Sequence, residues 1–277
     1  MAKKSQRLVV LACTHCGHRY GLTPPAWHEK RHRISGVTDP EARARIQYGN
    51  DLGKVQRAFW GWFEDAIDSL GEIDALLFNG DAIDGRQERC GGAELVAPDR
   101  LEQVDMATVI ANRVRAKQGR RMVIAGTPYH TGKLEEYERQ LARNIGAEFA
   151  QESFFDFGGK TIHSRHKVGG SSVPHGRATS LSRANTWNEI KAARGKEPRV
   201  SMVIRSHVHY HSFVGGPGWL ALTTPCLQLQ SVYGERECEG DTDIGFLVVD
   251  VDNEGNATWE THLMEADVLG RGKVQKL

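Results

Sequence analysis

Short apolar runs that end close to a histidine, aspartate or cysteine recur along this chain, and they constrain its fold more than any other feature. The clearest is residues 200–204 (VSMVI), which Arg205 and Ser206 separate from His207 and His209. A short apolar run bounded by polar residues is typical of a buried strand. Because ligands in open α/β sheets bind outside the carboxyl ends of strands, both imidazoles are expected at such an edge. The pattern predicts a ligand site at the ends of strands.

Four other apolar runs carry similar side chains at or just beyond their ends. They are residues 7–12, 73–78, 121–125 and 160–165. The side chains concerned are Cys13, His15, His18, Asp81, Asp84, Thr127, His130, His163 and His166. One histidine after a strand is usually an ordinary hydrogen-bonded residue, but five such endings in one chain are difficult to attribute to chance. Imidazole together with carboxylate suits Mn, Fe, Zn or Co, so the sequence predicts a transition-metal site.

The order of the expected elements indicates an α/β protein. Helical spacing of apolar residues over 52–70, and helix signals over 99–117 and 133–144, alternate with strands in the first half. Strands dominate afterwards, with one helix at 185–193. The expected strands there are 154–157, 160–165, 200–204, 218–222, 244–251 and 257–262. This order fits a single domain over residues 1–277, with two packed sheets flanked by helices. An irregular basic excursion is expected at about 22–51, where a lid could form.

Composition excludes some function classes. A formal net charge of +1 gives no overall field that would draw the protein onto nucleic acid. No apolar stretch approaches the roughly 20 residues of a membrane span, and the first residues lack the features of a signal peptide. Five cysteines, an odd number, favour a reducing compartment. We therefore expect a cytoplasmic protein with no membrane partner.

The order of the motifs resembles the calcineurin-like metallophosphoesterases, which include the Mre11-type nucleases. The matching blocks are Cys13-Thr14-His15, Gly80-Asp81-Ala82-Ile83-Asp84, Gly126-Thr127-Pro128-Tyr129-His130, His166 and Ser206-His207-Val208-His209. The resemblance spans residues 7 to about 215, and the residues around Cys16-Gly17-His18 look closest to phage and prophage members. It implies a four-layer αββα sandwich of two mixed β-sheets flanked by helices, and two divalent transition-metal ions.

The resemblance also implies roles for individual residues. The implied metal ligands are Cys13, His15 and His209 for the first ion, Asp81 between the two ions, and His166 and His207 for the second. His130 is expected to be a general acid or transition-state stabiliser, with metal ligation as the alternative. Asp84 is expected to support its loop, and His163 is the alternative to His166. Thr127 replaces the asparagine of the family pattern, and His18 has no assigned role.

Cys13 replaces the aspartate of the family's first block. A thiolate holds Zn or Fe but does not mimic a hard carboxylate toward Mn. Mn is the ion expected overall, with Zn or Fe as alternatives beside Cys13. Cys13 and Cys16 also fit a CxxC redox or zinc motif, but no helical periodicity follows them and no second close cysteine pair exists.

The expected activity is hydrolysis of phosphoric esters, most specifically by a phosphodiesterase or nuclease that uses metal-activated hydroxide. Lys30, Arg31 and Arg33 in the basic excursion, with Trp27 and Tyr48 as stacking groups, could contact DNA or RNA. A small-molecule phosphomonoesterase or a cyclic-nucleotide phosphodiesterase is the alternative. A protein that keeps the fold for binding and has lost catalysis is the alternative of another class.

Overall fold

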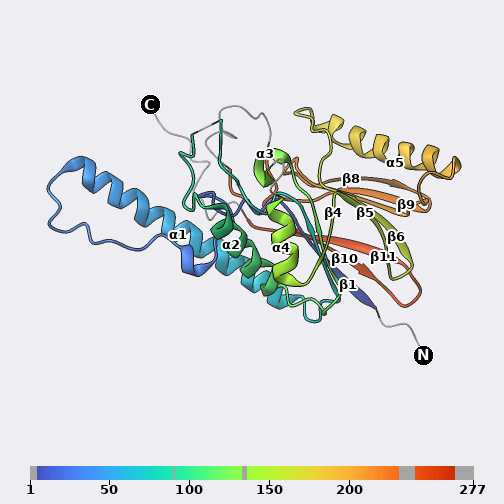
Figure 1. Cartoon of the computed structure of the whole chain (residues 1–277), viewed down its shortest axis with the longest axis horizontal. Helices are drawn as coiled ribbons and strands as arrows, with labels where there is room; N and C mark the ends of the chain where they lie inside the picture. Colours follow the sequence, from blue (N-terminus) through green and yellow to red (C-terminus); the bar gives the residue numbers. More distant parts are fainter. Residues whose placement is uncertain (1–4, 90, 133–135, 231–240, 266–277) are drawn as a thin grey trace.

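The computed structural model describes residues 5–89, 91–132, 136–230 and 241–265, and it contains two mixed β-sheets (Figure 1). The first sheet has the strand order β11-β10-β1-β2-β3-β4. Its strands are β1 (Gln6–Leu11), β2 (Ala75–Asn79), β3 (Arg121–Ile124), β4 (Glu148–Ala150), β10 (Gly245–Val251) and β11 (Ala257–Leu263). The second has the order β5-β6-β7-β9-β8. Its strands are β5 (Glu152–Phe157), β6 (Lys160–Arg165), β7 (Met202–Arg205), β8 (Ser212–Gly216) and β9 (Trp219–Thr223).

Parallel strands form the centre of both sheets. In the first sheet β1, β2, β3 and β4 are parallel, β10 pairs antiparallel with β1, and β11 pairs antiparallel with β10. In the second sheet β6, β7 and β9 are parallel, and β5 and β8 form antiparallel edges. The carboxyl ends of neighbouring parallel strands therefore meet at one edge of each sheet, where the sequence places the predicted metal-binding side chains.

Alternating side chains separate the layers. Val10, Leu77, Ile162 and Ile204 face the core between the two sheets. On the outer face of the first sheet pack helices α1 (Pro40–Ser69), α2 (Arg100–Arg113) and α4 (Tyr137–Ile145), whereas α5 (Arg177–Ala193) covers the second sheet. The expected four-layer αββα sandwich is therefore confirmed.

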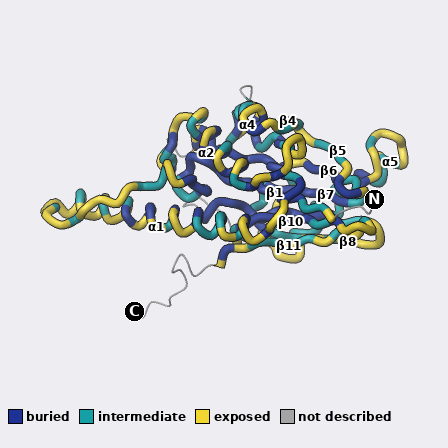
Figure 2. Tube along the Cα trace, turned by 90° about the horizontal axis from the view of Figure 1, so that it is seen from below, coloured by how far each residue is buried: buried dark blue, intermediate teal, exposed yellow. Residues whose placement is uncertain are grey.

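The expected excursion at 22–51 is only partly irregular. Residues 40–51 belong to α1, whose first residues follow the N-cap Asp39; the Asp39 carboxylate accepts the N–H groups of Glu41 and Ala42. This end of α1 projects from the rest of the protein and is exposed on most sides (Figures 1 and 2). The prediction of an irregular segment there is wrong, because a helix exposed on most sides shows no apolar periodicity.

The remaining differences are small. β4 and β8 were not expected, and α5 begins eight residues before the predicted start at 185. The predicted start of a helix at 133 lies outside the described residues, and α4 begins at Tyr137. The short helical turns are η1 (Pro25–Trp27), α3 (Pro128–Thr131) and η2 (Pro174–Gly176). None of the helices that the structure describes has the length and apolar character needed to cross a membrane.

Candidate metal centre

The loops after β1 and β2 run side by side. The backbone N–H groups of Cys13, His15 and Cys16 donate to the carbonyl oxygens of Gly80, Asp81 and Ala82, at 2.9, 3.1 and 3.0 Å. The pairing places Cys13 and His15 beside Asp81, as the parallel register of β1 and β2 requires.

Asn79, at the end of β2, joins the two sheets. Its Nδ2 donates to Ser206 Oγ at 2.7 Å, and its Oδ1 accepts from Ser164 Oγ at 2.8 Å. The Asn79 carbonyl oxygen lies 2.7 Å from His166 Nδ1, which leaves Nε2 of that imidazole to face Asp81. The strand ends of both sheets thus meet in one buried place.

Five of the candidate ligands have left-handed backbone conformations. Positive φ angles occur at eight non-glycine residues in the described part of the chain, and five of these are Cys13 (51°), His15 (44°), Asp81 (52°), His207 (76°) and His209 (56°). Such conformations cost roughly 1–3 kcal/mol each and persist where the surrounding structure enforces them, often at functional sites. Their coincidence with the predicted ligands indicates a site built at the expense of stability.

Asp81 lies between the other groups. Its Oδ1 accepts the N–H of Thr127 at 2.6 Å and the Thr127 hydroxyl at 3.1 Å. Its Oδ2 lies 2.9 Å from His166 Nε2 and 3.7 Å from His207 Nδ1. Burial acts to raise the pKa of Asp81, but the neighbouring histidines, His166 foremost, hold it well below its usual range. The carboxylate is therefore ionised and ready to bind a cation.

His15 and His209 face one another. Their Nε2 atoms lie 3.2 Å apart, and His15 Nδ1 lies 3.2 Å from Asp84 Oδ1. Burial lowers the pKa of both imidazoles, and a neighbouring histidine lowers it further: His130 for His15, and His15 for His209. Neutral imidazoles with one nitrogen fixed by a carboxylate are the form in which histidine binds a metal.

Asp84 also orients His130. His130 Nδ1 lies 2.8 Å from the Asp84 carbonyl oxygen and 3.5 Å from its Oδ1, so the Asp84 residue fixes both His15 and His130. The ring centroids of His15 and His130 are 4.5 Å apart. The support that Asp84 is expected to give its loop stays a prediction.

Cys13 is central to the donor set. Its thiol can form one group of metal-binding atoms with His15 and His209, and another with Asp81 and His166. Burial raises the pKa of Cys13 well above its ordinary value, and Asp81 raises it further, so the thiolate forms only where a cation replaces the proton. Sulfur, imidazole and carboxylate together fit a transition metal. A third group of donors, formed by His15, Asp81 and His130, leaves metal ligation open for His130.

Two predicted histidines lie elsewhere. His163 stacks on Phe154 with ring centroids 4.1 Å apart, and its Nδ1 lies 3.2 Å from Arg205 Nη2, on the far face of the second sheet. It is therefore wrong as an alternative to His166. His18 Nε2 lies 3.5 Å from Glu94 Oε2 and belongs to none of the donor groups in the described part of the chain.

The alternative CxxC interpretation also fails. Cys16 packs in the core beneath the first sheet, and its thiol faces Thr14 Oγ1 at 3.7 Å. Cys13 instead packs with Ala12 and Cys226. The two sulfurs of the motif thus lie in different environments.

Glu138 on α4 is a site residue that the sequence did not reveal. Its two carboxylate oxygens accept the N–H groups of Ala82, at 2.8 Å, and Gly126, at 2.5 Å. It thereby ties together the loops that carry Asp81 and Thr127. Burial, with a contribution from Asp81, raises the pKa of Glu138 to about 7. No spacing signal marks this residue, because it acts on backbone groups from a neighbouring helix.

The expected substrate-binding residues Lys30, Arg31 and Arg33 are exposed, and the segment that carries them is hydrogen-bonded to α1. Asn50 fixes this segment to the helix: its Oδ1 accepts the His32 N–H at 2.7 Å and its Nδ2 donates to the His32 carbonyl oxygen at 2.9 Å. We call residues 28–50 the basic arm.

The two aromatic residues expected to stack on bases differ from one another. Trp27 packs on the core, and its indole N–H donates to Glu102 Oε1 at 2.9 Å, so its assignment as a free stacking group is wrong. Tyr48 is 46% exposed, and its hydroxyl accepts from Arg19 Nη1 at 2.8 Å.

The fold and the donor set define a four-layer α/β protein with buried groups of potential metal-binding residues at its strand ends. No protein-family model and no curated protein matches the chain. Among solved structures it is similar to wild-type Vps29 complexed with Zn²⁺ from Entamoeba histolytica, with 13% identity over 93% of this chain and 99% of that one and a TM-score of 0.44. A predicted phosphoesterase from Streptococcus pneumoniae has 12% identity over 94% and 100% of the two chains and a TM-score of 0.37. An archaeal phosphodiesterase has 9% identity over 93% of this chain and 100% of that one, with a TM-score of 0.44.

Proposed function

We propose that this protein is a metal-dependent phosphoesterase whose substrates are phosphodiesters. The observation that carries the proposal is the convergence of five left-handed candidate ligands on one buried site around the ionised carboxylate of Asp81. Strained backbone conformations of this kind cluster at functional sites. A site that must hold cations in a fixed arrangement can require them, whereas the packing of a core does not.

The donor set divides into two neighbouring parts. Cys13, His15 and His209 would hold one ion, His166 and His207 would hold a second, and Asp81 would contribute to both. When bound, the metal ions supply Lewis-acid stabilisation of phosphate oxygens and an activated water. Mn is the ion first expected, and the thiol of Cys13 favours Zn or Fe at the first position.

His130 is suited to protonate the leaving oxygen. Because its Nδ1 donates to the Asp84 carbonyl oxygen, Nε2 remains for the substrate. The Asp84 carboxylate Oδ1 lies 3.5 Å from the same Nδ1 and helps to fix the orientation of the ring. The alkoxide that leaves a phosphodiester must receive a proton. His130 would supply this proton, while the metal ions would stabilise negative charge on the phosphate oxygens.

Hydrolysis of bis-p-nitrophenyl phosphate in the presence of Mn²⁺ or Zn²⁺ tests the proposal. Wild-type protein and Asp65→Asn, which changes an exposed aspartate of α1, should both show metal-dependent turnover. Asp81→Asn should lose it. A folded wild-type protein that binds metal but shows no turnover with either ion would instead support the non-catalytic binding protein.

The basic arm favours a nucleic-acid phosphodiester as the substrate. Its exposed cations, Lys30, Arg31 and Arg33, are held beside α1 and face solvent, where a phosphate backbone could reach them. The overall charge of +1 favours a local contact over tight duplex binding. The proposed substrate is accordingly single-stranded DNA or RNA, with small phosphodiesters as the alternative.

A further inference from the structure

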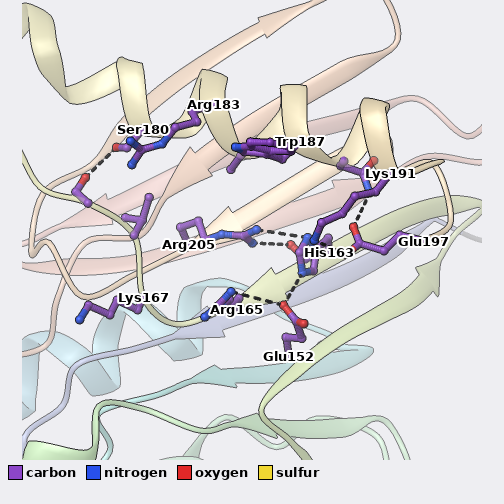
Figure 3. Close-up of a pocket in the computed structure, with 14 residues that line it drawn as sticks. Glu152, His163, Arg165, Lys167, Ser180, Arg183, Trp187, Lys191, Glu197 and Arg205 are labelled. Carbon is purple, nitrogen blue, oxygen red and sulfur yellow. Dashed lines mark hydrogen bonds and ion pairs between the residues drawn. The ribbon is translucent and has the colours of Figure 1, made fainter. Parts of the chain in front are cut away.

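A hollow lies on the face of the second sheet that points away from the candidate metal centre. Along β6, Ile162 and Ser164 point toward the first sheet, so His163 and Arg165 point outward toward α5. Arg205 at the end of β7 also faces outward. These side chains form the floor, and α5 forms the roof, of a hollow of about 320 Å³ (Figure 3). Its volume is at the lower end of the range typical of small-ligand sites, about 300–1,000 Å³.

The hollow carries an excess of positive charge. Its lining includes five cationic side chains, Arg165, Lys167, Arg183, Lys191 and Arg205, but only two carboxylates, Glu152 and Glu197. The carboxylates pair with Arg165 at 3.8 Å and with Lys191 at 2.5 Å. In the part of the chain that the structure describes, no carboxylate lies within ion-pair distance of the other three cations. An anion would therefore be attracted to their end of the hollow.

Arg205 is the most deeply buried of these three cations. The residue is only 5% exposed, and its guanidinium donates to the carbonyl oxygens of His163, at 3.1 Å, and Ile204, at 2.9 Å. Its Nη2 also lies 3.2 Å from His163 Nδ1, and burial, with Arg205, lowers the pKa of His163 to about 4, so this imidazole is neutral. A buried cation paired only with neutral groups is costly, and a bound anion would offset that cost.

One face of α5 adds a flat apolar surface beside these cations. Arg183 and Trp187 are one helical turn apart and both line the hollow (Figure 3). Trp187 is 54% exposed, so its ring is open to a ligand. A ring stacked on tryptophan next to cations that bind phosphate is a recurring way to hold nucleotides.

We propose that this hollow binds a nucleotide, with its phosphate near Arg183, Lys167 and Arg205 and its base against Trp187. The site is separate from the metal centre, because the sheet lies between them, so the proposal does not depend on phosphoesterase activity. The same chemistry could be presented by a free mononucleotide or by one unit of a nucleic-acid strand.

Isothermal titration calorimetry in EDTA tests the proposal without interference from metal-dependent hydrolysis. The probes are adenosine 5′-monophosphate, adenosine, inorganic phosphate and a single-stranded oligo(dA). Arg183→Gln and Trp187→Leu change exposed residues of the hollow, and Arg194→Gln changes an exposed arginine just beyond α5 that does not line it.

Binding of adenosine 5′-monophosphate that weakens about tenfold or more in Arg183→Gln and Trp187→Leu, but not in Arg194→Gln, is the expected result. Oligo(dA) binding with the same dependence on the variants, in place of the mononucleotide, identifies a strand as the source and also supports the proposal. Equal affinity for inorganic phosphate and adenosine 5′-monophosphate, unchanged by Trp187→Leu, would overturn the nucleotide assignment. No binding of any nucleotide probe would overturn it as well. Retained turnover of bis-p-nitrophenyl phosphate by Arg183→Gln separates this result from a failure of the metal centre.

Discussion

At the scale of single residues, the metal centre depends on unusually close approaches. Gly80 and Gly126 both lie against candidate ligands: a Cβ on Gly80 would come 2.5 Å from His166 Nδ1, and a Cβ on Gly126 would come 2.3 Å from Asp81 Oδ1. Even one methyl group cannot be placed at such distances without movement of the ligand. The two glycines therefore set how tightly the loops close around Asp81.

Gly126→Ala should lower metal content and reduce the free energy of unfolding by roughly 1–3 kcal/mol, because the new Cβ displaces Asp81 or its loop. Chemical denaturation and metal analysis measure the two effects. Gly49→Ala in α1 is the matched control: open space surrounds this position, and alanine there should stabilise the helix by up to about 1 kcal/mol. A Gly126→Ala protein with normal metal content would contradict the close packing around Asp81.

The two roles considered for His130 make different predictions. If it is the general acid, His130→Ala should lower kcat about 100-fold or more while metal content remains near that of the wild type. Steady-state kinetics with metal analysis on the same samples decides the matter. Loss of metal in proportion to activity would make His130 a ligand, as its place beside His15 and Asp81 also permits.

At the scale of elements, the sequence predicted the strands and their ends well, because apolar runs and polar endings are local patterns. It could not predict which side of a strand a residue faces. His163 points away from the first sheet along β6, whereas His166 lies just beyond the end of that strand and reaches Asp81. The role of Glu138 could not be predicted either. The packing of α4 brings its carboxylate to the backbone N–H groups of the site, and no residue spacing in the sequence indicates that contact.

The two histidines of β6 and its end provide a matched pair of variants. His166→Gln should lose bound metal, whereas His163→Gln should retain it and change only the surroundings of Arg205. Metal analysis after dialysis compares them directly. Equal loss of metal in both variants would contradict the assignment of faces in the second sheet.

At the scale of the whole molecule, the αββα sandwich brings the ends of both sheets to one place and leaves the basic arm projecting away from it (Figure 1). The sandwich followed from the order of strands and helices. The arm did not, because the first turns of α1 are exposed and have no apolar side; Asp39 and Pro40 were the only local signs of a helix start.

If the arm contacts a nucleic-acid strand, Lys30→Gln with Arg31→Gln and Arg33→Gln should weaken binding of single-stranded DNA. The slope of log K against log salt should fall in magnitude by up to about 2, since three phosphate contacts are lost. Fluorescence anisotropy over a salt series measures this slope. In a control variant, Arg115, Arg120 and Arg143 are changed to glutamine, which removes the same charge elsewhere on the protein. An equal change of slope in this control would contradict a specific contact between the basic arm and the strand.

The most direct test of the central claim is the number of metal ions bound per chain, measured by mass spectrometry of metals after loading with Mn²⁺ or Zn²⁺ and dialysis. Two ions are predicted for the wild type, with at least one lost in Asp81→Ala and one lost in Cys13→Ala. No stoichiometric metal in the wild type, or identical content in all three proteins, would contradict a metal centre built on these strand ends.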